Sequence, residues 1–469
     1  MRPPVWLLVS ALIAALSGAS SRALAGDARA LGHDAALRLA AERNIAVLVA
    51  SLERDRLGAV AEAARRPYLP ELAVESAGRN TGGERNAAIE ATAKLTYLSP
   101  YGQSLTATGS TSAGLAGNPE NQSALSIELS QALLRGGYQP GGAADLRQAD
   151  LDVKIAREQL RARLNDLLSS VDRAYWNLVF AREDVEVKRR SRDRARAQYD
   201  ETRENIKRGL LAPGEIYVVE ENVVNFDDGV SRAEENLALA ESALRRLLVL
   251  PPGTAIEATS PIAADDASEP ALAESLEAAA AHNPVVLAAR LTAERAKVGI
   301  SLDERRAMPQ LDAFGSLSVA AGRDQLAQPL PSDPTVRTGL RLSIPLTRGP
   351  DAARVRRARA EYAQRSLAIQ DAEADAGAAV SDALTRLRAR RDRLDMASRL
   401  VDLAQKKLDV QRDKYKSGLA TLPDVVRFQR DLDTALSNEL RARVDVLTAR
   451  TDLYAARGDL HERLKVSVR

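Results

Sequence analysis

The sequence predicts a mainly helical fold with β-strands, built from two copies of one structural plan. Three observations predict this fold. Residues recur at long, constant spacings along the chain. Apolar residues step by three and four through very long segments without internal proline, as in a helical heptad seam. Between these segments, apolar and polar residues alternate with the period of a β-strand.

Residues 1–25 predict a secretory signal peptide. Arg2 precedes a short apolar run that ends at Leu16, and an A-x-A pattern ends at Ala25. A positive start, a short apolar run and a small-residue end are typical of such peptides. The run is shorter than the roughly 20 apolar residues of a membrane-spanning helix, and no later stretch reaches that length. We therefore expect an exported chain without a transmembrane helix.

The composition favours no catalytic, redox or nucleic-acid chemistry. The chain has 66 basic and 64 acidic residues, and loss of a signal peptide holding Arg2 and Arg22 makes the two numbers equal. This neutral balance gives no support to nucleic-acid binding. The chain has no cysteine, and its three histidines stand far apart without metal-ligand spacing. We expect no catalytic residues, no cofactor and no metal site, so a secreted enzyme is the least supported interpretation.

Internal similarity indicates two repeats. The spacing between matched residues is 239 in the first part of each copy and settles at 209 from Leu146 onward. The first copy therefore carries about thirty extra residues in its middle. We place repeat 1 at 26–250, a linker rich in Pro, Ala, Ser and Asp at 251–270, and repeat 2 at 271–469. Matched pairs include Asn44 and Asn283, Pro70 and Pro309, Gly209 and Gly418, and Leu210 and Leu419.

Each repeat is predicted to begin with a helix and strands and to end with two long helices joined by a tight turn. The long helices are expected at about 143–208 and 212–250, and again at about 351–417 and 421–457. Their apolar residues form heptad seams rich in alanine, which lets helices approach closely. At 1.5 Å per residue, the longest are on the order of 100 Å long. Such helices are not built to cover an ordinary globular core, and they form a coiled coil.

The segments between the helices predict β-strands with one apolar and one polar face. We expect strands within about 71–134 in repeat 1, in four pieces at 71–79, 88–98, 103–113 and 124–134, and within about 311–346 in repeat 2. Alternation of this kind fits a membrane barrel with a wet interior. It fits a soluble β-sandwich equally well. The export signal and the long helices favour the barrel.

Several short motifs then carry a resemblance to a known family. Arg66-Pro67-Tyr68-Leu69-Pro70 precedes the first strand, and Asn283-Pro284 lies in an early helix. Further motifs are Gln131-Ala132-Leu133-Leu134-Arg135-Gly136, Tyr415-Lys416-Ser417-Gly418 and Pro423-Asp424-Val425-Val426. In this order and spacing, the chain resembles the TolC family of outer-membrane efflux proteins over nearly all of its mature length.

The resemblance implies a homotrimer whose copies share one transmembrane β-barrel and one long antiparallel coiled-coil tube in the periplasm. It implies an outer-membrane location with a large periplasmic extension. It also implies contacts with outer-membrane lipid, a periplasmic adaptor (membrane fusion protein) and an inner-membrane transporter. Such a protein is the exit duct of an efflux or type I secretion system, passing small molecules, metals or polypeptides. Similar proteins put two strands per repeat into a twelve-stranded barrel, so the extra residues of repeat 1 correspond to an added hairpin.

The same resemblance assigns residues near the two hairpin turns. Gly209, Leu210, Gly418 and Leu419 correspond to tips that touch the adaptor in the family. The glycines also have a structural explanation, because a helix commonly ends on a left-handed residue. Asp424, Glu215 and Tyr415 correspond to positions at a periplasmic gate facing the tube axis.

Asp424 has two interpretations that the sequence leaves open. In a trimer, three such carboxylates would meet at the narrowest point, repel one another and attract cations. Alternatively, Thr421-Leu422-Pro423-Asp424 is typical of a helix start with an acid near its positive end. Arg427 and Ala420 depart from the family pattern, so the family's closed-state ion pairs are not expected here.

A second class of function is a structural periplasmic coiled coil or adaptor that never spans a membrane. Adaptors usually carry one helical hairpin, whereas this chain is predicted to carry two complete hairpins. The balance of the sequence therefore favours the duct.

Overall fold

The computed structural model describes residues 29–80, 87–114, 122–135, 141–262, 268–321, 334–344, 346–347 and 349–464. The predicted signal peptide at 1–25 lies outside the described residues. The chain divides into two compact units. Unit 1 contains Met1–Val49, Arg161–Asn283 and Ala376–Arg469, and unit 2 contains Ala50–Leu160 and Pro284–Asp375. The prediction of a mainly helical chain with strands is confirmed.

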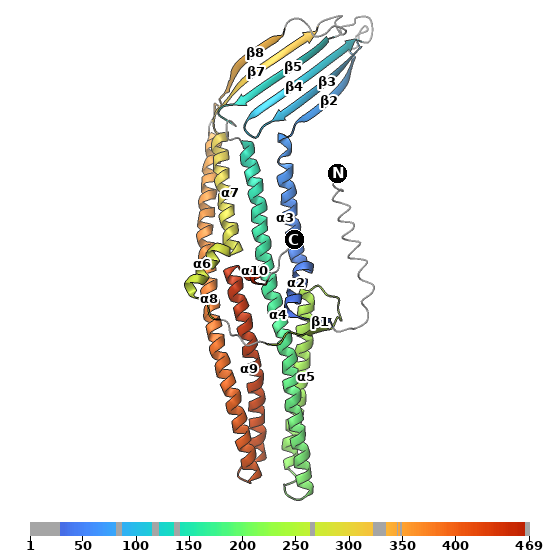
Figure 1. Ribbon diagram of the computed structural model, residues 1–469, viewed down its shortest axis with the longest axis vertical. Helices are drawn as coiled ribbons and strands as arrows, with labels where there is room; N and C mark the ends of the chain where they lie inside the picture. The colour runs from blue at the N-terminus through green and yellow to red at the C-terminus, as the bar shows by residue number, and fades with distance from the viewer. Residues whose placement is uncertain are drawn as a thin grey trace. The chain divides into compact units, whose positions relative to one another are not determined.

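Unit 2 contains one six-stranded antiparallel sheet. Its strands are β2 (Glu71–Asn80), β3 (Ala87–Leu98), β4 (Gln103–Gly114), β5 (Gln122–Ala132), β7 (Gln310–Ala321) and β8 (Thr335–Ser343). They lie in the order β2-β3-β4-β5-β7-β8, as Figure 1 shows. Each strand therefore pairs with its sequence neighbour, and β5 and β7 join across the long intervening helices.

The strand register gives this sheet one apolar face. Leu95 on β3 pairs with Leu72 on β2 and with Ala107 on β4. Across the next strands the same row continues, from Ile127 to Leu317 and on to Val336. The opposite face pairs Glu128 with Thr106 and Ser316, and Asp312 with Arg341. Because side chains alternate between faces, this register separates apolar from polar residues over the whole sheet.

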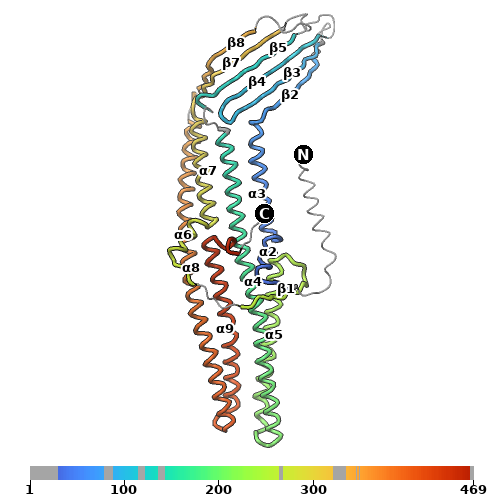
Figure 2. Tube along the Cα trace, viewed as in Figure 1, coloured from blue at the N-terminus to red at the C-terminus, as the bar shows by residue number. Residues whose placement is uncertain are grey.

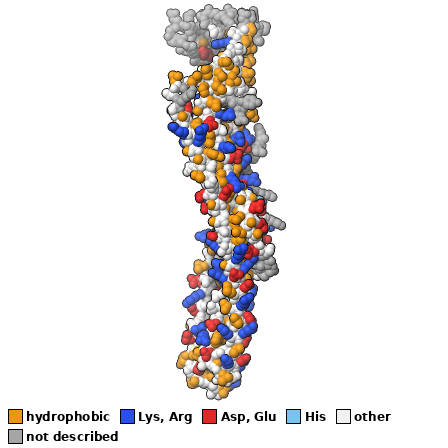
Figure 3. All heavy atoms as spheres, turned by 90° about the vertical axis from the view of Figure 1, so that its left-hand side faces the viewer, with side chains coloured by type: hydrophobic (Ala, Val, Ile, Leu, Met, Phe, Trp, Pro, Cys, Tyr) orange, Lys and Arg blue, Asp and Glu red, His pale blue; other side chains and the backbone are white. Residues whose placement is uncertain are grey.

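The apolar face of the sheet is exposed within the chain. Val74 is 72% exposed, and Val336 and Leu340 are each 69% exposed. Figure 3 shows hydrophobic side chains gathered over the strands, whereas charged side chains are interspersed over the helices. Among the described residues, the other sheet has two strands and lies in unit 1, so no second sheet of unit 2 buries this face. A soluble sandwich would bury it.

The helices of unit 2 are α7 (Pro284–Arg306) and the parts of α3 (Ile45–Ala63), α4 (Gly141–Lys207) and α8 (Gly349–Lys416) that belong to it. The 3₁₀ helix η1 (Arg66–Tyr68) leads into β2. Ion pairs join α7 to α4 and to α8, including Arg295 with Asp152 and Arg290 with Glu373, both at 2.6 Å.

Unit 1 is built on two helical hairpins. One consists of α4 and α5 (Glu215–Leu247), and the other of α8 and α9 (Leu422–Arg457); Figure 2 shows both turns. Buried residues of α8 and α9, among them Val380, Leu387, Val446 and Leu453, form a core cluster with Ala279. The heptad seams thus pack as coiled-coil seams do. Among the described helices, none is long and apolar enough to cross a membrane.

Short elements of unit 1 lie where α5 and α9 end, at the ends of the hairpins away from their turns. They are α2 (His33–Arg43), α6 (Leu272–His282), α10 (Leu460–Arg463), and the strands β1 (Arg29–Leu31) and β6 (Ile256–Ala258). The two strands pair in parallel. The segment 251–270, predicted as a linker, therefore contains a short strand. Within it, Ile256 and Ala258 are buried, at 5% and 8% exposure.

Two asparagines divide what the sequence suggested as single early helices. Asn44 separates α2 from α3 and donates a hydrogen bond from Nδ2 to the carbonyl of Leu247 at 3.1 Å. Asn283 separates α6 from α7 and donates in the same way to Ala456, also at 3.1 Å. Both residues have extended ψ angles, which stop the helix. Each asparagine thereby ties an early helix to the last turn of a hairpin.

The two hairpins end in left-handed residues of different kinds. Gly458 follows α9 with a φ of +82°, and Val249 follows α5 with a φ of +53°. A β-branched residue is strained in this region, whereas glycine is not.

Candidate functional site at the hairpin turns

The two hairpin turns of unit 1 have the same backbone design. Gly209 and Gly418 have φ angles of +71° and +73°. The amide of the following residue donates back to the helix, from Leu210 to Asn205 at 2.9 Å and from Leu419 to Lys414 at 2.8 Å. This pattern is a Schellman ending, for which glycine is the favoured residue. The structural explanation of the two glycines is therefore correct.

The leucines that follow the glycines are left exposed. Leu210 is 68% exposed and Leu419 is 79% exposed. In many Schellman endings the corresponding apolar residue packs back on its own helix. Here both side chains are instead available to a partner.

Glu215 and Tyr415 lie close to each other near the turns. Glu215 opens α5, and its Oε2 is buried without a hydrogen-bond partner among the described residues. Burial, followed by the charges of Glu215 and Glu201, raises the pKa of the Tyr415 phenol. Tyr415 packs against a cluster that includes Val219, Leu422 and Val426.

Asp424 is held by the start of its own helix. Its Oδ2 accepts hydrogen bonds from the Thr421 hydroxyl at 2.6 Å and the Thr421 amide at 3.3 Å. These two bonds, together with the charge of Arg427, lower the pKa of the carboxyl. Asp424 is thus a charged helix-capping residue. The structure brings Glu215 and Tyr415 together, whereas the carboxylate of Asp424 is bound by Thr421.

A hollow of about 280 Å³ lies beside this site, between α4, α8 and α9. Arg194 and Glu201 line it from α4, and Arg412 and Tyr415 line it from α8. Burial lowers the pKa of Arg194, an effect that Asp433 opposes and Arg412 and Arg190 reinforce.

Farther from the turns, polar side chains join α9 to the first hairpin. Asn222 donates to Gln429 at 3.3 Å and accepts from Arg430 at 3.0 Å. Lys188 pairs with Asp433 at 2.6 Å, with side-chain exposures of only 18% and 10%. The sequence alone does not single out these residues, because contacts between helices more than 200 positions apart leave no local signal.

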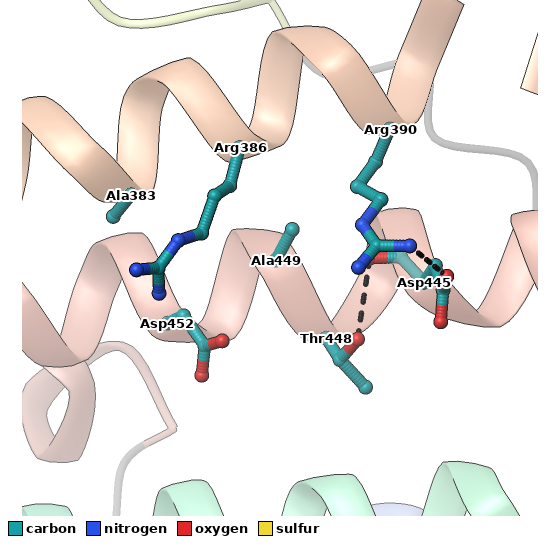
Figure 4. A pocket seen from close by; sticks show the side chains of 7 residues that line it. All are labelled: Ala383, Arg386, Arg390, Asp445, Thr448, Ala449 and Asp452. Atoms are coloured by element: carbon teal, nitrogen blue, oxygen red, sulfur yellow. Dashed lines mark hydrogen bonds and ion pairs between the residues drawn. The ribbon is translucent and has the colours of Figure 1, made fainter. Parts of the chain in front are cut away.

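A second hollow, of about 310 Å³, lies between α8 and α9. Arg386 and Arg390 extend from α8 toward Asp452 and Asp445 on α9, as Figure 4 shows. Asp445 accepts from Arg390 and pairs with Arg441 at 3.1 Å. The charges in this hollow balance one another, so it is best explained as part of the packing between the two helices.

A buried polar cluster joins the amino-terminal strand to α4. His33 contacts Asp172 at 2.7 Å, and the indole of Trp176 donates to the same carboxylate oxygen at 3.2 Å. The Tyr175 hydroxyl donates to the carbonyl of Leu31 at 3.0 Å. Burial alone would lower the pKa of His33, but the hydrogen bond and charge of Asp172, with help from Asp34, raise it above 6.5.

This cluster predicts a pH-dependent stability. The folded-state pKa of His33 is raised, so its contribution is complete below the unfolded value near 6.5 and is lost as pH rises through the folded pKa. We expect the thermal midpoint of the wild type to fall as the pH rises above about 6.5, through the raised folded-state pKa of His33. His33→Gln keeps a hydrogen-bond donor without a titrating group, so its midpoint should lack that fall. Parallel curves for the two proteins would contradict the assignment.

Side chains of the types that bind metals are dispersed in the part of the chain that the structure describes. No group of three or more His, Asp or Glu side chains there could hold a metal ion. Lys188 with Asp433 and Arg390 with Asp445 form ion pairs, and Asp424 caps α9.

Comparison with known proteins gives a consistent answer. The sequence model of a family described as outer membrane efflux protein matches residues 36–249 and 275–459. Protein CyaE of Bordetella pertussis (strain Tohama I) is 26% identical over 341 residues, which is 68% of this chain and 67% of that protein.

Solved structures show the same fold. The chain matches CusC, whose structures concern folding and transmembrane channel formation, with a TM-score of 0.68 at 17% identity, covering 94% of this chain and 95% of that one. It matches the outer membrane protein VceC of Vibrio cholerae with a TM-score of 0.66 at 16% identity, covering 91% and 96%. It matches the open state of the MtrE outer membrane channel of Neisseria gonorrhoeae with a TM-score of 0.67 at 18% identity, covering 91% and 88%.

Proposed function

Because this chain belongs to the outer membrane efflux protein family, we propose that it is the exit duct of an efflux or secretion system. Three copies assemble into one channel that crosses the outer membrane and extends into the periplasm. The channel passes small molecules, metals or polypeptides that an inner-membrane transporter delivers. It converts no energy and makes no covalent change in its cargo.

The exposed apolar face of the six-stranded sheet is the observation that carries this proposal. Val74, Val336 and Leu340 lie on that face and are about as exposed as surface residues of a soluble protein. Lipid is the environment in which such a face is stable, while the polar face lines water. A soluble periplasmic adaptor would have to expose this apolar face to water, which is unfavourable. Reconstitution provides the test: the purified chain should give ion-conducting steps in planar bilayers, and a chain that stays in the aqueous phase of detergent extracts contradicts the duct.

Exposed stripes on the two hairpins support the assembly of several copies. On α5, the side opposite the packed seam presents a heptad-spaced row that is exposed throughout. Tyr217 and Val224 in this row are 72% and 62% exposed, and its three acids are Glu221, Asp228 and Glu235. The complete row is Tyr217, Glu221, Val224, Asp228, Ser231, Glu235, Ala238 and Ser242.

The α8 helix carries a complementary row on its own unpacked side. Met396, Leu400, Leu403 and Val410 are between 51% and 59% exposed. Between them stand basic residues, so the complete row is Ala389, Arg393, Met396, Leu400, Leu403, Lys407, Val410 and Lys414.

When positions are counted from the turn glycines, the α5 and α8 rows are complementary: apolar residues lie level with apolar residues, and acids lie level with bases. Val224 lies fifteen residues after Gly209, and Leu403 lies fifteen residues before Gly418. Counted in the same way, Glu221 and Glu235 fall within one residue of the levels of Lys407 and Arg393. Because α5 runs away from its turn and α8 runs toward its turn, the rows would pack antiparallel. We propose that α5 of one copy packs on α8 of the next.

Cysteine pairs test this packing, since the natural chain has no cysteine. We expect the double variant Val224→Cys with Leu403→Cys to form disulfide-linked dimers and trimers on oxidation in outer-membrane preparations. The control is Val224→Cys with Gln405→Cys, because position 405 is about 200° around α8 from position 403. Equal cross-linking of the two variants, or none in either, would reject the proposed interface.

The gate proposal rests on the family resemblance and on the closeness of Glu215 to Tyr415. We propose that Glu215, Tyr415 and Asp424 line the periplasmic constriction. Asp424→Asn is expected to raise single-channel conductance or to weaken block by divalent cations, because it removes three negative charges from a trimer. Asp431→Asn is the matched control, because Asp431 is an exposed acid about two helical turns farther along α9. If conductance and block are unchanged in Asp424→Asn, capping of α9 is the sufficient role of this residue.

The exposed leucines of the turns support a contact with the periplasmic adaptor. We propose that Gly209, Leu210, Gly418 and Leu419 form the contact with the periplasmic adaptor. Leu210 and Leu419 are apolar side chains exposed at the hairpin turns, and an adaptor that covers them removes this apolar surface from water.

A further inference from the structure

The sheet of unit 2 contains more strands than the family resemblance implies. Two strands per repeat would give four strands per chain. The structure has six in one sheet, because the hairpin formed by β3 and β4 stands between β2 and β5. This hairpin accounts for the residues that repeat 1 has in excess.

The added hairpin is an integral part of the sheet. β3 pairs with β2 along its length, from Thr96 opposite Glu71 to Ala87 opposite Asn80. It also pairs with β4, from Leu98 opposite Ser104 to Ala88 opposite Gly114. β4 in turn pairs with β5 over ten positions, from Gln103 to Ser112. A hairpin that folded over the sheet as a flap would lack this continuous pairing on both sides.

The side chains of the hairpin also continue the two faces of the sheet. Leu95 on β3 and Ala107 on β4 stand in the same row as Leu72 on β2 and Ile127 on β5. On the other face, Lys94 pairs with Thr108 and Thr106 with Glu128. The hairpin is therefore apolar where its neighbours are apolar and polar where they are polar. It has the pattern of wall strands, which meet lipid on one side and water on the other.

The two edges of the sheet are positioned to pair with other copies. The described side chains of β2, from Glu71 to Gly78, are all exposed, and β8 is exposed at all but one position. An exposed edge offers unpaired backbone groups to another strand. Because the number of strands is even, β8 of one copy runs antiparallel to β2 of the next, and the alternation continues across the junction.

We propose that each copy contributes all six strands, so that three copies close an eighteen-stranded barrel with an exterior opening that admits bulky solutes, extended polypeptides included. This inference rests on the proposed trimeric duct. Barrel diameter grows roughly in proportion to strand number, so the bore should be about 1.5 times as wide as in a twelve-stranded barrel. Barrels of 16–18 strands leave an aqueous channel.

Polymer exclusion tests the width. Polyethylene glycols of graded size are added to the exterior side of a planar bilayer, and those that enter the barrel lower its conductance. The comparison is a variant lacking residues 87–114, in which β2 and β5 remain antiparallel and their apolar faces remain on the same side. We expect the largest polymer radius admitted to fall by about one third in this variant. The same size limit in both proteins would overturn the proposal.

Cysteine cross-linking tests the closure without relying on the deletion. Val74 on β2 and Leu340 on β8 lie near corresponding ends of their strands and are 72% and 69% exposed. In an eighteen-stranded barrel, Val74→Cys with Leu340→Cys should link neighbouring copies through a short flexible thiol reagent. Ala107→Cys with Leu340→Cys should not, because β4 lies inside the sheet of each copy.

The reverse pattern would mean that β8 meets β4 of the next copy, in a twelve-stranded barrel from which β2 and β3 are excluded. That result would overturn the proposal. A chain that links β8 to β2 but shows no conductance would instead refute the proposed duct while supporting the closure, so the two failures are distinguishable.

Discussion

Replacing Gly458 by alanine is expected to lower the free energy of unfolding by about 3 kcal/mol or more. Two causes add. The residue has a φ of +82°, where any side chain is strained. An added Cβ would also stand 2.5 Å from the Cα of Asn283 and 2.7 Å from the carbonyl oxygen of His282, both in backbone that cannot move aside cheaply. Thermal or denaturant unfolding followed by circular dichroism, at fixed protein and detergent concentration, measures the change.

Gly209→Ala separates the two causes. Gly209 has a similar φ of +71°, but an added Cβ there meets nothing within 4 Å. Its replacement should cost only the backbone strain, about 1 to 2 kcal/mol. Equal losses in the two variants would show that the approach of Asn283 to Gly458 contributes nothing to stability.

Asp433→Asn is expected to lower the free energy of unfolding by about 3 kcal/mol. The variant leaves the charge of Lys188 largely buried without its partner, which now stands at 2.6 Å. It also removes the negative charge of Asp433, which counteracts the lowering of the Arg194 pKa by burial. A buried ion pair is costly to break because the remaining charge stays desolvated, even where the pair as a whole adds little to stability.

The double variant Lys188→Met with Asp433→Leu provides the contrast. It removes both charges and replaces them with apolar groups, so most of the lost stability should return. The exposed pair of Arg189 and Glu234, at 2.8 Å, is the surface control, and Glu234→Gln should change stability far less. If the double variant is less stable than Asp433→Asn, the explanation by an uncompensated charge is wrong.

The regular part of the fold could be predicted from periodicity alone. Heptad steps along the chain predicted long helices, and the structure has α4 at Gly141–Lys207 and α8 at Gly349–Lys416. Alternation predicted strands, and the structure places β2 to β5 in the same segment. Each of these patterns extends over many residues, so local chemistry suffices to recognise it.

Irregular features escaped prediction for identifiable reasons. β6 has three residues, too few to show a period of two, and its burial depends on β1, which is more than 200 residues away. At the helix break, Asn44 donates a hydrogen bond to the carbonyl of Leu247, which lies 203 positions away. The pairing of Lys188 with Asp433 likewise joins two helices that the sequence separates by 245 positions.

The candidate site was predicted in part through resemblance. The turn glycines had a local explanation that the φ angles confirm. For Asp424 the sequence left capping and gating equally open, and the hydrogen bonds from Thr421 establish the capping role. The gating role depends on residues of other copies, so it stays a prediction.

The open edges of β2 and β8 have a consequence for biogenesis. A monomer exposes two unpaired edge strands and an apolar sheet face, so it is prone to aggregate until it assembles. Dilute subunits should be vulnerable to proteases and to wrong strand pairings, whereas crowding at the target bilayer favours rapid mutual capture. In the proposed trimer, we therefore expect the yield of closed channels to depend more on how quickly subunits meet than on the strength of any single contact.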